Sequence, residues 1–192
     1  MLRLIYGIHY RGGPICTTLS PLGKITLACD VCGKNRVGLW REGQKYYQGT
    51  LKEALIEKDA VPLFDIAKKW LDRYFSGQKP DVAELPLAPQ GNAFRQGVWE
   101  ILCTIPYGEV ITYGSIAKKM AVKLQKERMS SQAVGGAVGH NPMSIIIPCH
   151  RVVGANGSLT GYAGGIEKKI KLLELEGVDM SGFFIPQKGT AL

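Results

Sequence analysis

The chain has 192 residues, of which 45% are hydrophobic, and its mean hydropathy is close to zero. It can bury one sizeable core or two small ones and has the balance of an ordinary soluble globular protein. Its apolar runs are far shorter than a membrane span, and residues 1–13 have too short an apolar core for a secretory signal, so we expect a cytoplasmic protein with no membrane partner. The formal net charge of +8 favours a polyanionic partner.

The first half of the sequence predicts a small sheet followed by one helix. Short strands are expected at 15–19, 24–29 and 36–40, separated by turn-forming residues. An amphipathic helix is expected over 62–75, where apolar residues recur at helical spacing at Leu63, Ala67, Trp70, Leu71 and Tyr74. Nothing in this half indicates catalysis.

The five cysteines indicate reduced thiols rather than a disulfide framework, because their number is odd and the chain reads as intracellular. Cys29 and Cys32 form a C-x-x-C, which together with Cys16 and His9 could supply the four ligands of a tetrahedral zinc site. A second C-x-x-C is missing from the sequence. We therefore expect plain core thiols and no metal, with zinc as the alternative.

Residues 78–92 contain three prolines and little periodicity, which is typical of a linker. We place a domain boundary near residue 90. The sequence thus predicts two domains, an α/β domain over residues 1–90 that includes the proline-rich linker, and a second domain over 91–192.

The second half predicts three short helices. The first has one apolar face formed by Phe94, Val98, Ile101, Leu102 and Ile105. Thr112 is a natural N-cap for a helix from 113 to about 120, and Ser130 or Ser131 caps another that runs through 132–138. Short helices with tight connections predict a helix-turn-helix architecture.

Two features of this half bear on nucleic-acid binding. Gly135 and Gly136 lie inside the third helix, where each costs roughly 1 kcal/mol relative to alanine. Small residues there fit either insertion into a narrow minor groove or close packing against another helix. The segment 118–151 carries a local excess of positive charge, which fits a phosphate-facing patch or a solvated helix face; its cations are Lys118, Lys119, Lys123, Lys126, Arg128 and Arg151.

Cys149 and His150 are adjacent within an apolar run, a pairing that fits a nucleophile. The thiolate is the reactive form of cysteine, and a neighbouring imidazole lowers the pKa of a thiol. Pro148 suits the first position of a helix, whose N-terminus would also favour a thiolate. The alternative is a buried cysteine that acts as a small hydrophobic residue.

The wider context of this pair resembles the O6-alkylguanine-DNA alkyltransferase family. The resemblance is strongest from Phe94 to Gly177, and it rests on Ile147-Pro148-Cys149-His150-Arg151-Val152, on Asn141-Pro142, and on Thr160-Gly161-Tyr162-Ala163-Gly164-Gly165. It implies an α+β two-domain fold with a ribonuclease H-like N-terminal domain and a C-terminal winged helix-turn-helix-like domain. It also implies a cysteine S-methyltransferase that acts once on methylated DNA, without a cofactor, as a monomer, and repairs O6-alkylguanine in double-stranded DNA directly.

The resemblance also implies roles for five residues. Cys149 corresponds to the acceptor of the alkyl group, His150 to the base that takes its proton through a water, and Glu176 to the carboxylate that orients the imidazole. Tyr113 corresponds to the donor to guanine N3, and Asn141 to a hinge that ties the DNA-reading helix to the active-site turn. Such a protein must flip the damaged base out of the duplex, because O6 lies within the base stack.

Further residues correspond to positions that contact the DNA or the flipped base: Tyr113, Gln132, Ala133, Gly135, Gly136, Val152, Tyr162 and Ala163. Two of them depart from the family pattern. Gln132 stands where an arginine fills the gap left by the flipped base, and Ala163 stands where a serine is often found. Additional lysines after Tyr113 could offset the missing arginine through phosphate contacts.

Three other functions remain open at this point. A non-catalytic relative that only binds alkylated DNA would carry tryptophan in place of Cys149. A cysteine hydrolase using Cys149, His150 and Glu176 is disfavoured because nucleophile and base normally come from separate elements. A helix-turn-helix regulator accounts for the helices and the basic segment but leaves the Cys149-His150 pair without a use.

Overall fold

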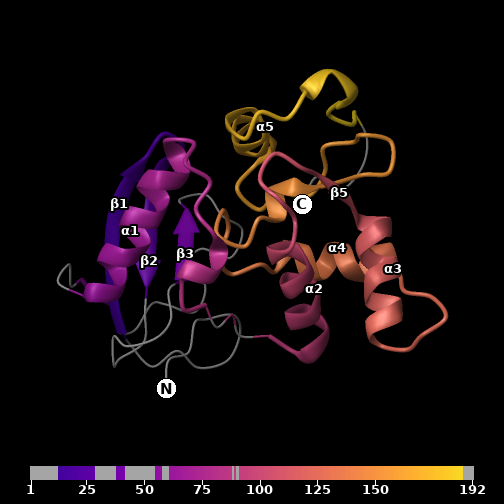
Figure 1. The fold of residues 1–192 in the computed structure, drawn as a ribbon, viewed down its shortest axis with the longest axis horizontal. Helices are drawn as coiled ribbons and strands as arrows, with labels where there is room; N and C mark the ends of the chain where they lie inside the picture. Colours follow the sequence, from indigo (N-terminus) through magenta and orange to yellow (C-terminus); the bar gives the residue numbers. More distant parts are fainter. Residues whose placement is uncertain are drawn as a thin grey trace. The chain divides into compact units, whose positions relative to one another are not determined.

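The computed structural model describes residues 13–28, 38–41, 55–57, 61–87, 89 and 91–187. The chain forms two compact units, Met1–Gln90 and Gly91–Leu192, each of which is described by itself (Figure 1). None of the helices in the described ranges is long and apolar enough to cross a membrane.

The first unit contains a four-stranded sheet with the order β3-β2-β1-β4. Its strands are β1 (Gly13–Ser20), β2 (Gly23–Ala28), β3 (Gly38–Arg41) and β4 (Leu55–Glu57). β2 pairs antiparallel with both β1 and β3, whereas β4 pairs parallel with β1. The three predicted strands overlap β1, β2 and β3. β4 was not predicted, because three residues are too few to show a period.

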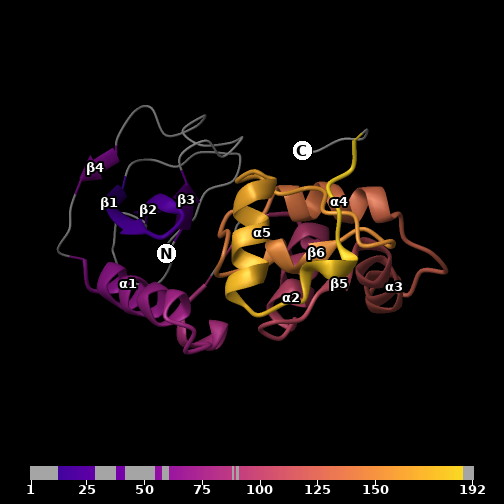
Figure 2. The ribbon, with the colours of Figure 1, turned by 90° about the horizontal axis from the view of Figure 1, so that it is seen from above.

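Helix α1 (Pro62–Phe75) packs against this sheet (Figure 2). Its first residue is Pro62, which has no N–H to lose at a position where no intrahelical bond is made. All five apolar residues of the predicted face are buried. The rings of Trp70 and Tyr74 stack with their centroids 5.6 Å apart. The unit is therefore an α+β structure, as predicted.

The predicted linker is only partly a linker. The Trp70 indole N–H donates to the carbonyl of Asp81 at 2.8 Å, and Leu85 is buried. Between them the short 3-10 helix η1 (Val82–Glu84) is closed by a capping box, and Glu84 is paired with Arg73. The first part of the proline-rich segment is therefore anchored to α1, a non-local contact that its composition does not reveal.

The second unit begins with three helices in mutual contact: α2 (Ala93–Cys103), α3 (Tyr113–Lys123) and α4 (Ser131–Gly139). Their N-caps are Asn92, Thr112 and Ser130, whose side chains accept hydrogen bonds from backbone N–H groups of the first turn. The buried Trp99 indole N–H donates to the carbonyl of Ala137 at 2.9 Å. This bond ties α2 directly to α4.

The rest of the unit places the Cys149-His150 pair beside the start of α3. The short strand β5 (Ile111–Thr112) pairs parallel with β6 (Val152–Val153). β5 leads directly into α3, and β6 directly follows the 3-10 turn η2 (Cys149–Arg151). Helix α5 (Ile166–Leu175) and the 3-10 helix η3 (Met180–Gly182) complete the unit. Val153, Leu159 and Leu173 form a buried cluster at their junction.

Candidate active site

The turn that carries Cys149 is held from behind by Asn141. The Asn141 amide donates to the carbonyl of Ile147 at 2.7 Å, and its oxygen accepts from the N–H of Met143 at 3.0 Å. Asn141 is buried and lies two residues beyond the end of α4. Its side chain thus connects the end of α4 to the residues immediately before Pro148 and Cys149.

Cys149 itself lies below the surface, with 3% of its area exposed. The expectation that Pro148 starts a helix is wrong: Pro148 precedes a 3-10 turn of only three residues. So short a turn sums few peptide dipoles, and little of the stabilisation of a thiolate comes from it. A thiolate at Cys149 would therefore depend on the charges of neighbouring side chains for its stabilisation.

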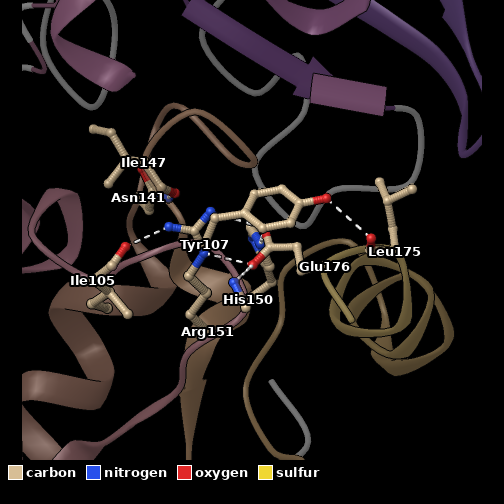
Figure 3. A network of polar contacts seen from close by, with 9 residues as sticks. Ile105, Tyr107, Asn141, Ile147, His150, Arg151, Leu175 and Glu176 are labelled. Carbon is tan, nitrogen blue, oxygen red and sulfur yellow. Dashed lines mark hydrogen bonds and ion pairs between the residues drawn. The ribbon is translucent and has the colours of Figure 1, made fainter. Parts of the chain in front are cut away.

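On one side of this turn, His150, Arg151 and Glu176 form a buried charged network (Figure 3). His150 Nε2 lies 2.7 Å from Glu176 Oε1. Arg151 donates to both carboxylate oxygens, from Nε at 2.8 Å and from Nη2 at 2.9 Å, and donates from Nη1 to the carbonyl of Ile105. The N–H of Gly108 donates to Glu176 Oε2 at 3.1 Å.

Gly108 is required for this last bond. Its φ is +81°, and an added Cβ would lie 2.9 Å from the carbonyl oxygen of Glu176. A larger residue would therefore be strained and would push the turn away from the carboxylate.

Glu176 is ionised at neutral pH because of these donors. Burial by itself would raise the pKa of its carboxyl group, but the hydrogen bonds and charges of His150 and Arg151 outweigh burial and bring the pKa to about 2. An ionised carboxylate only accepts hydrogen bonds, so His150 Nε2 carries the proton. In the neutral imidazole the second nitrogen, Nδ1, is then the basic one.

Tyr113, the first residue of α3, is near enough to Cys149 for the charge of the thiol group to act on it. Its hydroxyl donates to the carbonyl of Thr160 at 3.2 Å. Burial and the charge of the Cys149 thiolate raise the pKa of Tyr113 to about 12, so the phenol stays protonated at neutral pH. A Cβ on Gly161, whose φ is +67°, would lie 2.5 Å from this hydroxyl. Glycine at 161 therefore leaves the space that the phenol occupies.

The structure adds one residue that the sequence did not single out. Lys169 of α5 is fully buried, and its Nζ donates to the carbonyls of Val152 and Thr160. A signal was present in the sequence, because Lys169 lies three residues after Ile166 and four before Leu173, on the apolar face of the helix. A lysine at such a position is either at the edge of the core or inside it.

Other predicted contact residues lie close to this group, with different exposures. The carbonyl of Val152 accepts from Lys169 at 2.5 Å, which leaves one lone pair for another donor. Tyr162 is buried, and its ring meets that of His150 edge-on at 6.5 Å. Ala163 is partly exposed in the glycine-rich loop that follows.

The predicted DNA-facing residues of α4 lie on its exposed side. Gln132, Ala133 and Gly136 are exposed, whereas Val134 is buried. A Cβ on Gly136 would meet nothing within 4 Å, and one on Gly135 would only touch the ring of Tyr113 at 3.9 Å. Packing within the unit therefore does not require glycine at 136.

The basic segment is smaller than its sequence indicates. Arg151, counted there as one of six cations, is buried against Glu176, because its turn faces the interior. Lys123 forms an ion pair with Glu100. Among the described residues, the exposed cations of this segment that form no ion pair are Lys118, Lys119, Lys126 and Arg128.

Metal binding is not supported by the described residues, none of which form a group of three or more metal-ligating side chains. Cys16 is buried in β1. The other residues of the zinc alternative, His9, Cys29 and Cys32, lie outside the described ranges.

Comparisons with known proteins point in one direction. Residues 93–178 match the family model described as "6-O-methylguanine DNA methyltransferase, DNA binding domain". The methylated-DNA–protein-cysteine methyltransferase of Haemophilus influenzae is 38% identical over 157 residues, which cover 82% of this chain and 82% of that protein. The protein of the same name from Methanosarcina acetivorans is 42% identical over 158 residues, covering 82% and 94%.

A solved structure agrees with these sequence matches. OGT of Mycobacterium tuberculosis in complex with DNA is similar to this chain with a TM-score of 0.73 and 39% identity, covering 85% of this chain and 93% of that one. Identity of about 40% over most of both chains leaves no other assignment: the chain belongs to the methylated-DNA–protein-cysteine methyltransferase family.

Proposed function

We propose that this protein repairs O6-methylguanine in DNA by transferring the methyl group to Cys149. The bond between Cys149 Sγ and the methyl carbon forms while the bond between that carbon and O6 breaks. The electron pair of the broken bond stays on guanine, which gains a proton and is restored. The thioether has no ready leaving route, so each chain acts once.

The observation that carries this proposal is the arrangement around Cys149. His150, which follows Cys149 in the chain, supplies a basic nitrogen, and Tyr113 supplies a phenol that stays protonated. Cys149, His150 and Glu176 are all buried. We assign His150 Nδ1 the proton of the thiol, through a water, since Nε2 is held by Glu176. We assign Tyr113 the hydrogen bond to N3 of the leaving base, because its pKa keeps it protonated.

The burial of Cys149 supports flipping of the damaged nucleotide. A thiol that is 3% exposed cannot reach an atom inside a base stack, so the base must leave the duplex and enter the protein. Unstacking costs a few kcal/mol, and contacts with the flipped base and the duplex must supply that energy.

The exposed side of α4 supports minor-groove contact in double-stranded DNA. Gly136 has open space beside it, so a narrow groove can approach the helix backbone there. Gln132 and Ala133 lie exposed in the first turn of the same helix. This exposure leaves both free to contact the gap left by the flipped base. Exposed cations on and after α3, such as Lys119 and Arg128, would meet the phosphates.

We also propose a finer fold class for each of the two domains. The three antiparallel strands with a parallel fourth strand and one packed helix support a ribonuclease H-like first domain over residues 1–90. The α2–α4 helices with the β5–β6 pair support a winged helix-turn-helix-like domain over 91–192.

The decisive experiment incubates the protein with an excess of duplex containing one O6-methylguanine and measures its intact mass. We expect a gain of one methyl group per chain, which peptide mapping locates on Cys149. Cys149→Ala should show no gain, whereas Cys103→Ala, which removes an exposed thiol, should behave as the unchanged chain. An unmodified mass after prolonged incubation, or a methyl group on another residue, contradicts the proposal.

A further inference from the structure

Lys169 is a buried cation that the reaction described above does not use. Lys169 is fully excluded from solvent and is one of the largest fully buried side chains among the described residues. Burying a lysine costs free energy unless its ammonium is hydrogen-bonded and its charge is balanced. We therefore expect contacts that compensate for the cost of burying Lys169.

The first reason lies in the two carbonyls that the ammonium binds. Lys169 Nζ lies 2.5 Å from the oxygen of Val152 and 2.6 Å from that of Thr160. Val152 directly follows the Cys149–Arg151 turn, and Thr160 directly precedes Gly161. One side chain thus fixes the distance between the turn with the thiol and the loop that lies against Tyr113.

The second reason is the balance of charge around the turn. Lys169 of α5 and Glu176, the C-cap of this helix, are seven residues apart, about two helical turns, and both are buried. Glu176 already accepts hydrogen bonds from Arg151 and His150. The charge that acts on Lys169 is that of Cys149: burial lowers the pKa of the ammonium, the thiolate raises it, and the result is a pKa of about 8.

The geometry points to Lys169 as a positioning residue of the methyl transfer, which holds the carbonyls of Val152 and Thr160 together and stabilises the thiolate of Cys149. Lys169 from α5 and Tyr113 from α3 both donate to the carbonyl of Thr160, and the charge of Cys149 acts on both. His150 and Arg151 follow Cys149 directly in the same turn. This role rests on the proposed function only in that Cys149 is the acceptor.

A consequence follows for the spent protein. Methylation of Cys149 turns a thiolate into a neutral thioether, so the buried ammonium loses the negative charge that acts on it. The pKa of Lys169 should therefore fall below its value of about 8 in the unreacted chain.

The test measures the thiolate without DNA. The rate at which iodoacetamide modifies Cys149 is followed against pH by quantifying the Cys149 peptide in Lys169→Met, Lys169→Arg and Lys171→Met. We expect the midpoint of the profile to rise by about one pH unit in Lys169→Met. Lys169→Arg, which keeps the charge, should restore most of it, and Lys171→Met, an exposed control on the same helix, should leave it unchanged. A folded Lys169→Met with the midpoint of the unchanged chain overturns the inference.

A second measurement needs no variant that removes the charge. The ¹³Cε resonance of Lys169, assigned by its loss in Lys169→Arg, is titrated before and after iodoacetamide has converted Cys149 to a thioether. We expect the midpoint to fall, and an unchanged midpoint overturns the inference. Neither measurement depends on transfer from DNA, so a failure of methyl transfer and a failure of the Lys169–Cys149 coupling are read separately.

Discussion

Helices α4 and α5 of the second unit break the ordinary rules of packing in opposite ways. α4 has glycine on its exposed side, where nothing in the unit excludes a side chain. α5 carries a lysine and is followed at once by a glutamate, both on its buried side, where apolar residues would pack at lower cost. The comparison teaches that ordinary packing is broken by a missing side chain on an exposed face and by charges on a buried one. The proposed function gives a reason for each, which is room for DNA beside α4 and charge beside Cys149.

The largest expected effect comes from removing the charge of Glu176. Glu176→Gln leaves the buried Arg151 without its carboxylate, so we expect a loss of about 3–5 kcal/mol in the free energy of unfolding. We also expect methyl transfer to slow about a hundredfold or more, because the amide no longer fixes the imidazole as a base. Urea unfolding and single-turnover kinetics measure the two effects.

The matched control is Glu174→Gln, an exposed glutamate on the same helix. It should change neither quantity. Equal effects of the two substitutions would mean that the buried side of α5 is no more important than its exposed side.

Acid should weaken the fold through the same carboxylate. The pKa of Glu176 is about 2 in the folded protein and ordinarily 4.5, so the native state is stabilised by its ionised form above pH 4.5. This contribution, roughly 3 kcal/mol, is lost progressively as the pH falls from 4.5 toward 2. Urea unfolding measured across this range should show a steeper acid loss in the unchanged chain than in Glu176→Gln. Parallel curves would contradict the pairing of Glu176 with His150 and Arg151.

On α4, Gln132→Arg should tighten binding to duplex DNA. It adds a cation at the start of an exposed helix face, so the salt dependence of the binding constant should steepen by about one unit of slope. Glu127→Gln adds the same net charge in the preceding segment and serves as the control. If both variants gain equally on O6-methylguanine duplex, net charge and not position 132 accounts for the change.

The smallest expected effect is that of Gly136→Ala, which tests the contrast between α4 and α5 most directly. Gly136→Ala should raise the free energy of unfolding by about 0.5–1 kcal/mol, because alanine favours a helix and its Cβ meets open space. The same substitution should weaken DNA binding, since the added methyl group stands in the way of the duplex. Unfolding and fluorescence-anisotropy titrations on one preparation test both signs. A stabilised variant with unchanged affinity would remove α4 from the DNA interface.

The sequence predicted local features of this site well. Thr112 was predicted as a cap, and the second cap was narrowed to Ser130 or Ser131, of which Ser130 is the one, because capping depends on residues within three positions. The Cys149-His150 pair is likewise contiguous. The burial of Arg151 and Lys169 depends instead on partners that lie 25 and 17 residues away, at Glu176 and Val152. Charge counting along the chain cannot see such partners, and it therefore placed Arg151 on a basic surface.

The β5–β6 pair was missed for the same reason. Each strand has two residues, which show no alternation, and the pairing joins Thr112 to Val153 across 41 positions. The role of Glu176 came from the family resemblance alone. A glutamate at the end of a charged helix is interpreted as a surface acid until its hydrogen bonds with Gly108, His150 and Arg151 are known.

The hydrogen bond from Tyr113 to the carbonyl of Thr160 has a consequence for how damaged DNA is received. The phenol already donates to a carbonyl within the protein, so a base bound as proposed would exchange one acceptor of this hydrogen bond for another. Such an exchange is nearly neutral in free energy. In the proposed role of Tyr113 as donor to N3, the hydrogen bond passes to a base only when that base is a better acceptor than a peptide carbonyl, as a guanine that is becoming negatively charged is.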